Sequence, residues 1–251
     1  MHPTLLHLGH LTLPTFGVLA AVGLIAALQL SASIAPRLGL DPERVWNAGL
    51  FLVFAAFLLS RLLLVATNVA SFRAYPILLL MVPSLTPLGL VLTAVVLAIY
   101  IWLRQLPLRP LLDTWAAPAT LLWAFLALGH FFEGSDPGLP TSTHLGLRET
   151  ASAPATFPVA LFAAILALAI TAILLRALYT RSRAPGHLAA VALALTGLTQ
   201  FLLTFLREPF RYQLPFTSPP DPIQWLALGM IVAATVLYVT PSHTRTFPEL
   251  A

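Results

Sequence analysis

Residues 116–138, AAPATLLWAFLALGHFFEGSDPG, join an apolar segment to a short polar one. The first part, as far as residue 132, has the length and composition that a helix needs to cross the hydrocarbon core of a bilayer. The second part, residues 129–138, is termed the polar segment and holds one histidine, two carboxylates and three glycines. The stretch therefore predicts a membrane-spanning helix that ends at a polar site.

The composition of the whole chain supports a membrane protein. Hydrophobic residues make up 59% of the 251 residues and charged residues only 9%, whereas soluble domains are about a quarter charged. A chain of this length holds about seven helices of roughly 20 residues with short connections. We therefore expect an all-α integral membrane protein, with residues 1–251 forming a single polytopic domain.

Apolar segments of spanning length recur along the chain, and several begin with a proline, which is tolerated in the first turn of a helix. The seven segments are 14–33, 47–69, 84–103, 116–132, 157–178, 188–206 and 223–240. They predict a bundle of seven transmembrane helices.

Arginine supplies every strongly cationic side chain and sets the expected orientation. The connections after the first, third and fifth segments, together with the C-terminal tail, hold eight arginines, whereas the connections on the other side hold four. The positive-inside rule then predicts an N-terminus outside the cytoplasm, a C-terminus inside it, and an outward-facing polar segment. The net charge of +4 is too small and too dispersed for nucleic-acid binding.

The polar segment carries the candidate catalytic residues His130 and Glu133. Imidazole exchanges protons near neutral pH, so His130 is suited to act as a general base, and Glu133 is close enough along the chain to orient it or to accept a proton itself. The alternative is a simple polar cap where a helix leaves the membrane. Because the chain has no cysteine and no HExxH, GxSxG or phosphate-loop motif, we expect no metal and no cofactor.

Two further polar features lie within apolar segments. Arg61 lies deep in the second segment, where a charge is costly and commonly functional. The alternative is an arginine that reaches the boundary or pairs within the bundle. Gln200, Thr204 and Arg207 occupy one face of the sixth segment. This face can hold helices together, or its arginine can bind a lipid phosphate.

The order of these features resembles the prolipoprotein diacylglyceryl transferase family. The polar segment is similar to the family signature, G-R-x-G-N-F-x-N-G-E-x-x-G, and matches it at Gly129, Phe131, Gly134 and Gly138. The other stretches that carry the resemblance are Leu11–Gly23, Ser60-Arg61-Leu62, Asp113 with Ala117-Pro118, Phe157-Pro158, residues 205–209 and Gln224.

Charged positions of the family pattern differ in this chain. In the signature, Ala127 takes the place of the arginine, His130 and Glu133 those of the two asparagines, and Ser135 that of the acid. The list of departures also includes Phe16 in place of a tyrosine, Gln200 and Thr204 in place of an arginine and a glutamate, and no counterpart of a histidine near residues 84–87.

The resemblance implies a multi-pass protein of the bacterial inner (plasma) membrane that transfers diacylglyceryl from phosphatidylglycerol to the cysteine of a precursor lipoprotein. Its partners would be phosphatidylglycerol, the precursor's signal peptide and membrane lipids. His130 and Glu133 would be catalytic, and the substrate-binding residues would be Arg61, Gly129, Gly134, Gly138, Arg148 and Arg207. The alternatives are a catalytically impaired relative that binds phospholipid or precursor, and a small membrane transporter subunit.

Overall fold

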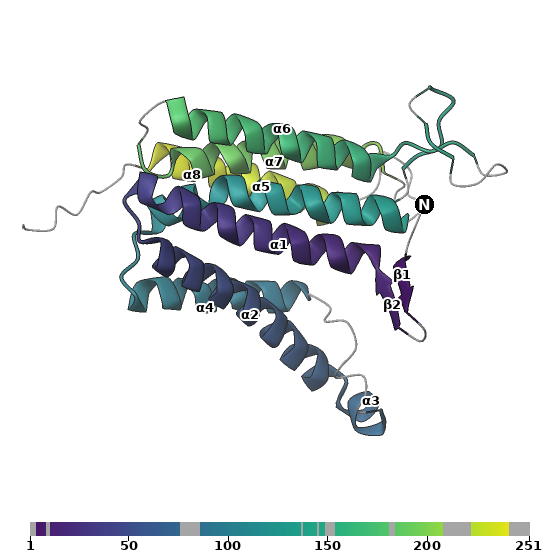
Figure 1. The fold of residues 1–251 in the computed structure, drawn as a ribbon, viewed down its shortest axis with the longest axis horizontal. Helices are drawn as coiled ribbons and strands as arrows, with labels where there is room; N and C mark the ends of the chain where they lie inside the picture. The colour runs from purple at the N-terminus through teal and green to yellow at the C-terminus, as the bar shows by residue number, and fades with distance from the viewer. Residues whose placement is uncertain are drawn as a thin grey trace, which may run out of the picture. The chain divides into compact units, whose positions relative to one another are not determined.

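The computed structural model describes residues 4–8, 11–75, 86–136, 138–144, 146–148, 154–180, 184–207 and 222–240. Within these residues the chain is built almost entirely of helices (Figure 1). The helices are α1 (Thr15–Ile34), the short 3-10 helix η1 (Ala35–Leu38), α2 (Pro42–Thr67), α3 (Val69–Ala74), α4 (Pro87–Leu103), α5 (Leu108–Glu133), α6 (Val159–Thr180), α7 (His187–Thr204) and α8 (Pro222–Val239).

Seven of these helices correspond to the seven predicted apolar segments. Six are long and apolar enough to cross a membrane, and α4 contributes a shorter apolar helix over Leu88–Leu103. The prediction of a helical integral membrane protein is confirmed. The orientation of the chain across the membrane stays a prediction.

Two helices begin earlier than the apolar pattern predicted. Helix α2 begins at Pro42, because the Asp41 carboxylate accepts a hydrogen bond of 3.0 Å from the backbone N–H of Glu43 and so caps the helix. Helix α5 begins at Leu108 and runs through Pro118, where the sequence had suggested a helix start. A proline removes one helical hydrogen bond, which membrane helices tolerate when neighbouring helices satisfy the freed carbonyl.

A small antiparallel hairpin precedes α1 and was not predicted. Strand β1 (Thr4–Leu8) pairs with β2 (Leu11–Pro14), with Leu8 opposite Leu11. The apolar pattern of these residues continues into α1, so the sequence offers no clear boundary between the two.

The chain divides into two compact units, of which the first comprises Met1–Ser31 and Leu112–Ala251. In this unit α7 packs against both α6 and α8. A Cβ atom at Gly197 would lie 2.8 Å from the carbonyl oxygen of Ala227, so a glycine is what allows α7 and α8 to approach closely. The Thr120 and Thr171 hydroxyls share a hydrogen bond of 2.9 Å between α5 and α6.

Asp113, near the start of α5, is buried and caps the first turn of α7, although the two lie far apart in sequence. Its carboxylate accepts hydrogen bonds from the backbone N–H groups of Gly186, at 2.6 Å, and Ala189, at 2.8 Å. Gly186 occupies the N-cap position of α7 and has no side chain with which to cap it. Asp113 therefore supplies the acceptor that the first turn of α7 needs.

The second unit, Ala32–Leu111, consists mainly of α2 and α4 packed antiparallel. At one end the rings of Phe51 and Tyr100 stack with centroids 4.3 Å apart. At the other end the backbone N–H of Thr86 donates to Ser60 Oγ over 3.3 Å. The prediction of one domain over the whole chain stays a prediction.

Candidate functional site

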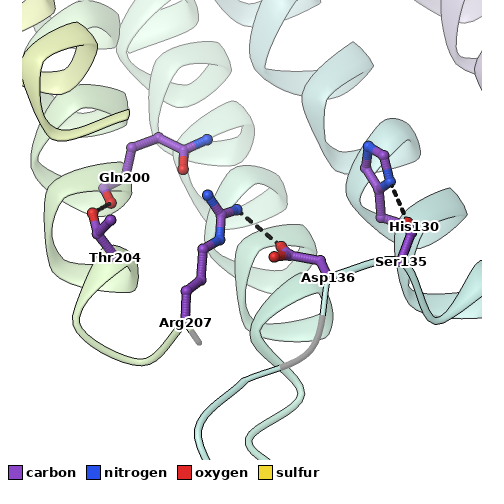
Figure 2. A network of polar contacts seen from close by, with 6 residues as sticks. All are labelled: His130, Ser135, Asp136, Gln200, Thr204 and Arg207. Atoms are coloured by element: carbon purple, nitrogen blue, oxygen red, sulfur yellow. Dashed lines mark hydrogen bonds and ion pairs between the residues drawn. The ribbon is translucent and has the colours of Figure 1, made fainter. Parts of the chain in front are cut away.

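Two polar side-chain pairs lie where α5 and α7 end (Figure 2). His130 Nδ1 and Ser135 Oγ share a hydrogen bond of 2.7 Å, and both side chains are exposed. Arg207 and Asp136 form an ion pair in which a guanidinium nitrogen lies 2.9 Å from a carboxylate oxygen. Because Ser135 and Asp136 are consecutive residues, one short piece of chain holds both pairs.

The turn after α5 explains why Ser135 meets His130. The backbone N–H groups of Gly134 and Ser135 both donate to the carbonyl of His130, over 2.9 and 3.2 Å. Gly134 has a φ of +71°, a left-handed conformation that glycine adopts without strain and that commonly ends a helix. The chain thus turns back on the last helical turn and carries the Ser135 hydroxyl to the imidazole.

A second contact fixes the other side of the histidine ring. The ring of Phe16 lies 4.7 Å from that of His130, centroid to centroid, at an angle of 44°. Gly129 makes this approach of α1 to α5 possible, because a Cβ atom there would lie 2.7 Å from the Phe16 ring. His130 is therefore held between an aromatic face and a hydroxyl while its side chain stays exposed.

Both the backbone and the side chain of Arg207 contact the polar segment. Gly138 and Arg207 form an isolated antiparallel bridge, and the N–H of Leu139 donates to the carbonyl of Leu206 over 2.9 Å. Gly138 is itself packed against the backbone carbonyl of Phe157, so that no larger residue fits. The Arg207 and Asp136 side chains are only 18% and 24% exposed, which limits the screening of their ion pair by water.

Two polar atoms beside this ion pair are buried without a partner among the described residues, Arg207 Nε and Gln200 Oε1. Figure 2 shows the Gln200 amide extending from α7 toward the guanidinium of Arg207. The hydroxyl of Thr204 donates to backbone carbonyls of its own helix, over 2.8 Å to Gln200 and 3.0 Å to Phe201. Arg207 thus keeps an N–H donor that its ion pair with Asp136 does not use.

The structure places the remaining predicted site residues elsewhere. Glu133 is exposed at the last position of α5, and the side chain that shares a hydrogen bond with His130 is that of Ser135. Arg148 is exposed in the connection between α5 and α6. Arg61 belongs to the second unit, where its guanidinium carbon lies 5.4 Å from the centre of the Phe72 ring.

The predicted glycines mainly allow the protein to pack closely on itself. Gly129 and Gly138 make room for Phe16 and Phe157, and Gly134 forms the turn after α5. Ala127, which stands at the arginine position of the resembled signature, lies in a buried apolar cluster with Val159, Ala163 and Leu203.

Comparison with known proteins now gives the family. The sequence profile named prolipoprotein diacylglyceryl transferase matches residues 3–240. The chain belongs to this family. Two curated relatives are the phosphatidylglycerol–prolipoprotein diacylglyceryl transferases of Thermosynechococcus vestitus, 29% identical over 139 residues, and Synechococcus elongatus, 28% identical over 142 residues.

Each match covers only part of this chain and only part of the relative. They cover 54% and 55% of this chain, and 52% and 49% of the two relatives. The chain therefore spans about half the length of the curated relatives it matches. Family membership and the apolar helices together describe a multi-pass membrane protein of the transferase type.

Sequence reasoning missed the partners of the two central side chains in this family member. Ser135 was noted only as a departure from the signature, and Asp136 only as one charge of the polar segment. The usable signal was Gly134, since a glycine directly after an apolar helix predicts a left-handed turn that folds the next residues back onto the helix end.

Proposed function

We propose that this chain transfers the diacylglyceryl group of phosphatidylglycerol to the thiol of a cysteine in a precursor lipoprotein. In this reaction a carbon–sulfur bond forms at the glycerol carbon of the lipid, and the bond from that carbon to the phosphate oxygen breaks. Glycerol phosphate leaves with the electron pair, and the thiol proton passes to a base. The family and the names of both relatives support the reaction.

The observation that carries the proposal is the hydrogen bond between His130 and Ser135. When Nδ1–H donates to the Ser135 hydroxyl over the 2.7 Å that separates them, Nε2 is the unprotonated nitrogen. Thiolate, not thiol, is the attacking species, so a base that removes this proton near neutral pH is what the transfer needs. Phe16 and Ser135 orient the ring, and the exposure of His130 leaves it accessible to a substrate.

Arg207 is proposed to bind the phosphate of phosphatidylglycerol and to stabilise the negative charge of the departing glycerol phosphate. A guanidinium binds phosphate through paired N–H donors, and Arg207 Nε is a donor with no partner among the described residues. Asp136 orients the guanidinium through an ion pair with one terminal nitrogen, 2.9 Å away. Arg148, Arg61 and Glu133 remain proposed contributors from the resemblance alone.

The proposal is tested by complementing a strain depleted of its own diacylglyceryl transferase. We expect the wild-type chain to restore lipoprotein processing and His130→Ala to fail, because loss of a positioned base lowers rates by about 10²–10⁴-fold. His144→Ala is the matched control, since His144 is an exposed histidine of the connection that follows α5. Equal rescue by His130→Ala, with both variants inserted at wild-type levels, would show that His130 is not the base.

A second candidate function is a relative that binds phospholipid or precursor without transferring the lipid. The burial of Ala127 in an apolar cluster, at the position where the resembled signature has an arginine, favours this alternative. It predicts that the purified chain binds phosphatidylglycerol yet forms no thioether product. Family membership is the reason why we prefer either candidate to a transporter subunit.

A further inference from the structure

A cavity of about 400 Å³ lies in the second unit, where the first turns of α2 face the last turn of α4. None of its lining residues belongs to the two polar pairs of the candidate site. It is lined by Arg44, Asn47, Tyr100, Leu103, Arg104 and Leu106.

The lining gathers hydrogen-bond donors and includes no carboxylate. Arg104, the C-cap residue of α4, has its guanidinium carbon 5.7 Å from the centre of the Tyr100 ring, and Tyr100 in turn stacks on Phe51. Arg44 forms an exposed contact of 3.6 Å with Asp41, and exposed ion pairs of this kind contribute little. The two guanidinium groups are therefore able to exchange these contacts for a bound anion.

The helix surfaces next to the cavity are apolar and exposed. Leu50, three residues after Asn47 on α2, is 44% exposed, and Leu103, at the mouth of the cavity, is 65% exposed. Trp102 is 70% exposed in the same turn of α4, and tryptophan is enriched at the level of the lipid headgroups. The cationic donors of the cavity thus lie beside exposed apolar side chains of the same two helices.

We propose that this cavity binds the phosphate of an anionic phospholipid, whose acyl chains lie along the exposed apolar residues of α2 and α4. Two arginines suit this ligand because each guanidinium presents several donors in a plane that matches phosphate oxygens. The positive-inside rule assigns the arginine-rich ends of α2 and α4 to the cytoplasmic leaflet. The inference does not depend on the proposed transfer reaction.

The experiment uses the full chain in nanodiscs that contain a phosphatidylglycerol with a photoreactive acyl chain, or a phosphatidylcholine with the same chains. Crosslinked peptides are identified by mass spectrometry. We expect phosphatidylglycerol to label peptides of α2 and α4 at least several-fold more than phosphatidylcholine. The combined substitutions Arg44→Gln and Arg104→Gln should lower this labelling about tenfold, because two charge-assisted hydrogen-bonding groups are lost.

Two further variants separate charge from folding. The paired changes Arg44→Lys and Arg104→Lys keep the charges and should keep most of the labelling, whereas Arg176→Gln removes one exposed arginine of α6 and should leave it unchanged. Unchanged labelling in the double glutamine variant would overturn the proposal. Loss of labelling on addition of millimolar inorganic phosphate would also overturn it, since the cavity would then select free phosphate.

Discussion

At the scale of single residues, the proposed function depends on where two side chains of the polar segment point. Ser135 turns toward His130 and Asp136 turns toward Arg207, although the two residues are consecutive (Figure 2). One turn of chain thereby holds the partners of both the imidazole and the guanidinium. In this member of the transferase family, the His130–Ser135 hydrogen bond joins two residues that depart from the family signature.

We propose that Ser135 positions the His130 ring, and removal of its hydroxyl tests this role. We expect Ser135→Ala to lower kcat about tenfold, because the imidazole loses the hydrogen bond that selects its tautomer, while KM for phosphatidylglycerol changes little. Ser135→Thr keeps a hydroxyl and should recover part of the rate. Ser142→Ala, an exposed serine of the same connection, serves as the control.

Substitution of Arg207 should impair lipid binding more than proton transfer. We expect Arg207→Gln to raise KM for phosphatidylglycerol roughly tenfold to a hundredfold, as expected for loss of a charge-assisted hydrogen bond to phosphate. Steady-state kinetics with a lipobox peptide as acceptor measure this change. A variant whose KM for the lipid equals that of the wild type would exclude Arg207 from phosphate binding.

At the scale of secondary-structure elements, buried polar caps and close packing by small residues hold the helices in place. Asp113 links α5 to the start of α7, and Gly197 allows α7 to pack on α8. Arg207 directly follows α7, so the position of this helix also determines that of the candidate phosphate-binding residue.

Removal of the Asp113 carboxylate should therefore destabilise the protein. In Asp113→Ala the N–H groups of Gly186 and Ala189 lose their buried acceptor, which costs about 1–3 kcal/mol. Thermal unfolding in detergent should show a lower Tm. Asp41→Ala removes a comparable but exposed cap from α2 and should have a smaller effect, so an equal loss of Tm in both variants would contradict this account.

The helices could be predicted from the sequence more readily than the side-chain contacts between them. Apolar segments of spanning length have few alternatives in a bilayer, so the seven helices followed from the sequence. The end of α5 was also predictable from the sequence, because the apolar segment gives way to a charged side chain at Glu133. The pairing of Asp136 with Arg207 joins residues that are far apart in sequence, and no local pattern encodes it. The contact of Ser135 with His130 is local by comparison, and the left-handed turn at Gly134 is the signal that could have predicted it.

At the scale of the whole molecule, the arginine distribution predicts which ends of the helices face the cytoplasm. The chain has no cysteine, so single cysteines report their own accessibility without background. We expect Ser142→Cys to react with a membrane-impermeant maleimide in cells whose outer membrane alone is permeable, and Glu43→Cys to react only after the inner membrane is opened. The reverse pattern would invert the orientation and place the polar segment in the cytoplasm.

The central claim is that a histidine in the altered signature region supports diacylglyceryl transfer. It is tested most directly by mass spectrometry of a cysteine-containing lipobox peptide, incubated with phosphatidylglycerol and the purified chain. We expect a peptide whose mass increases by one diacylglyceryl group, in a yield that His130→Ala lowers about a hundredfold or more and His144→Ala leaves intact. A peptide of unchanged mass, with a wild-type chain that is folded and binds the lipid, would contradict it.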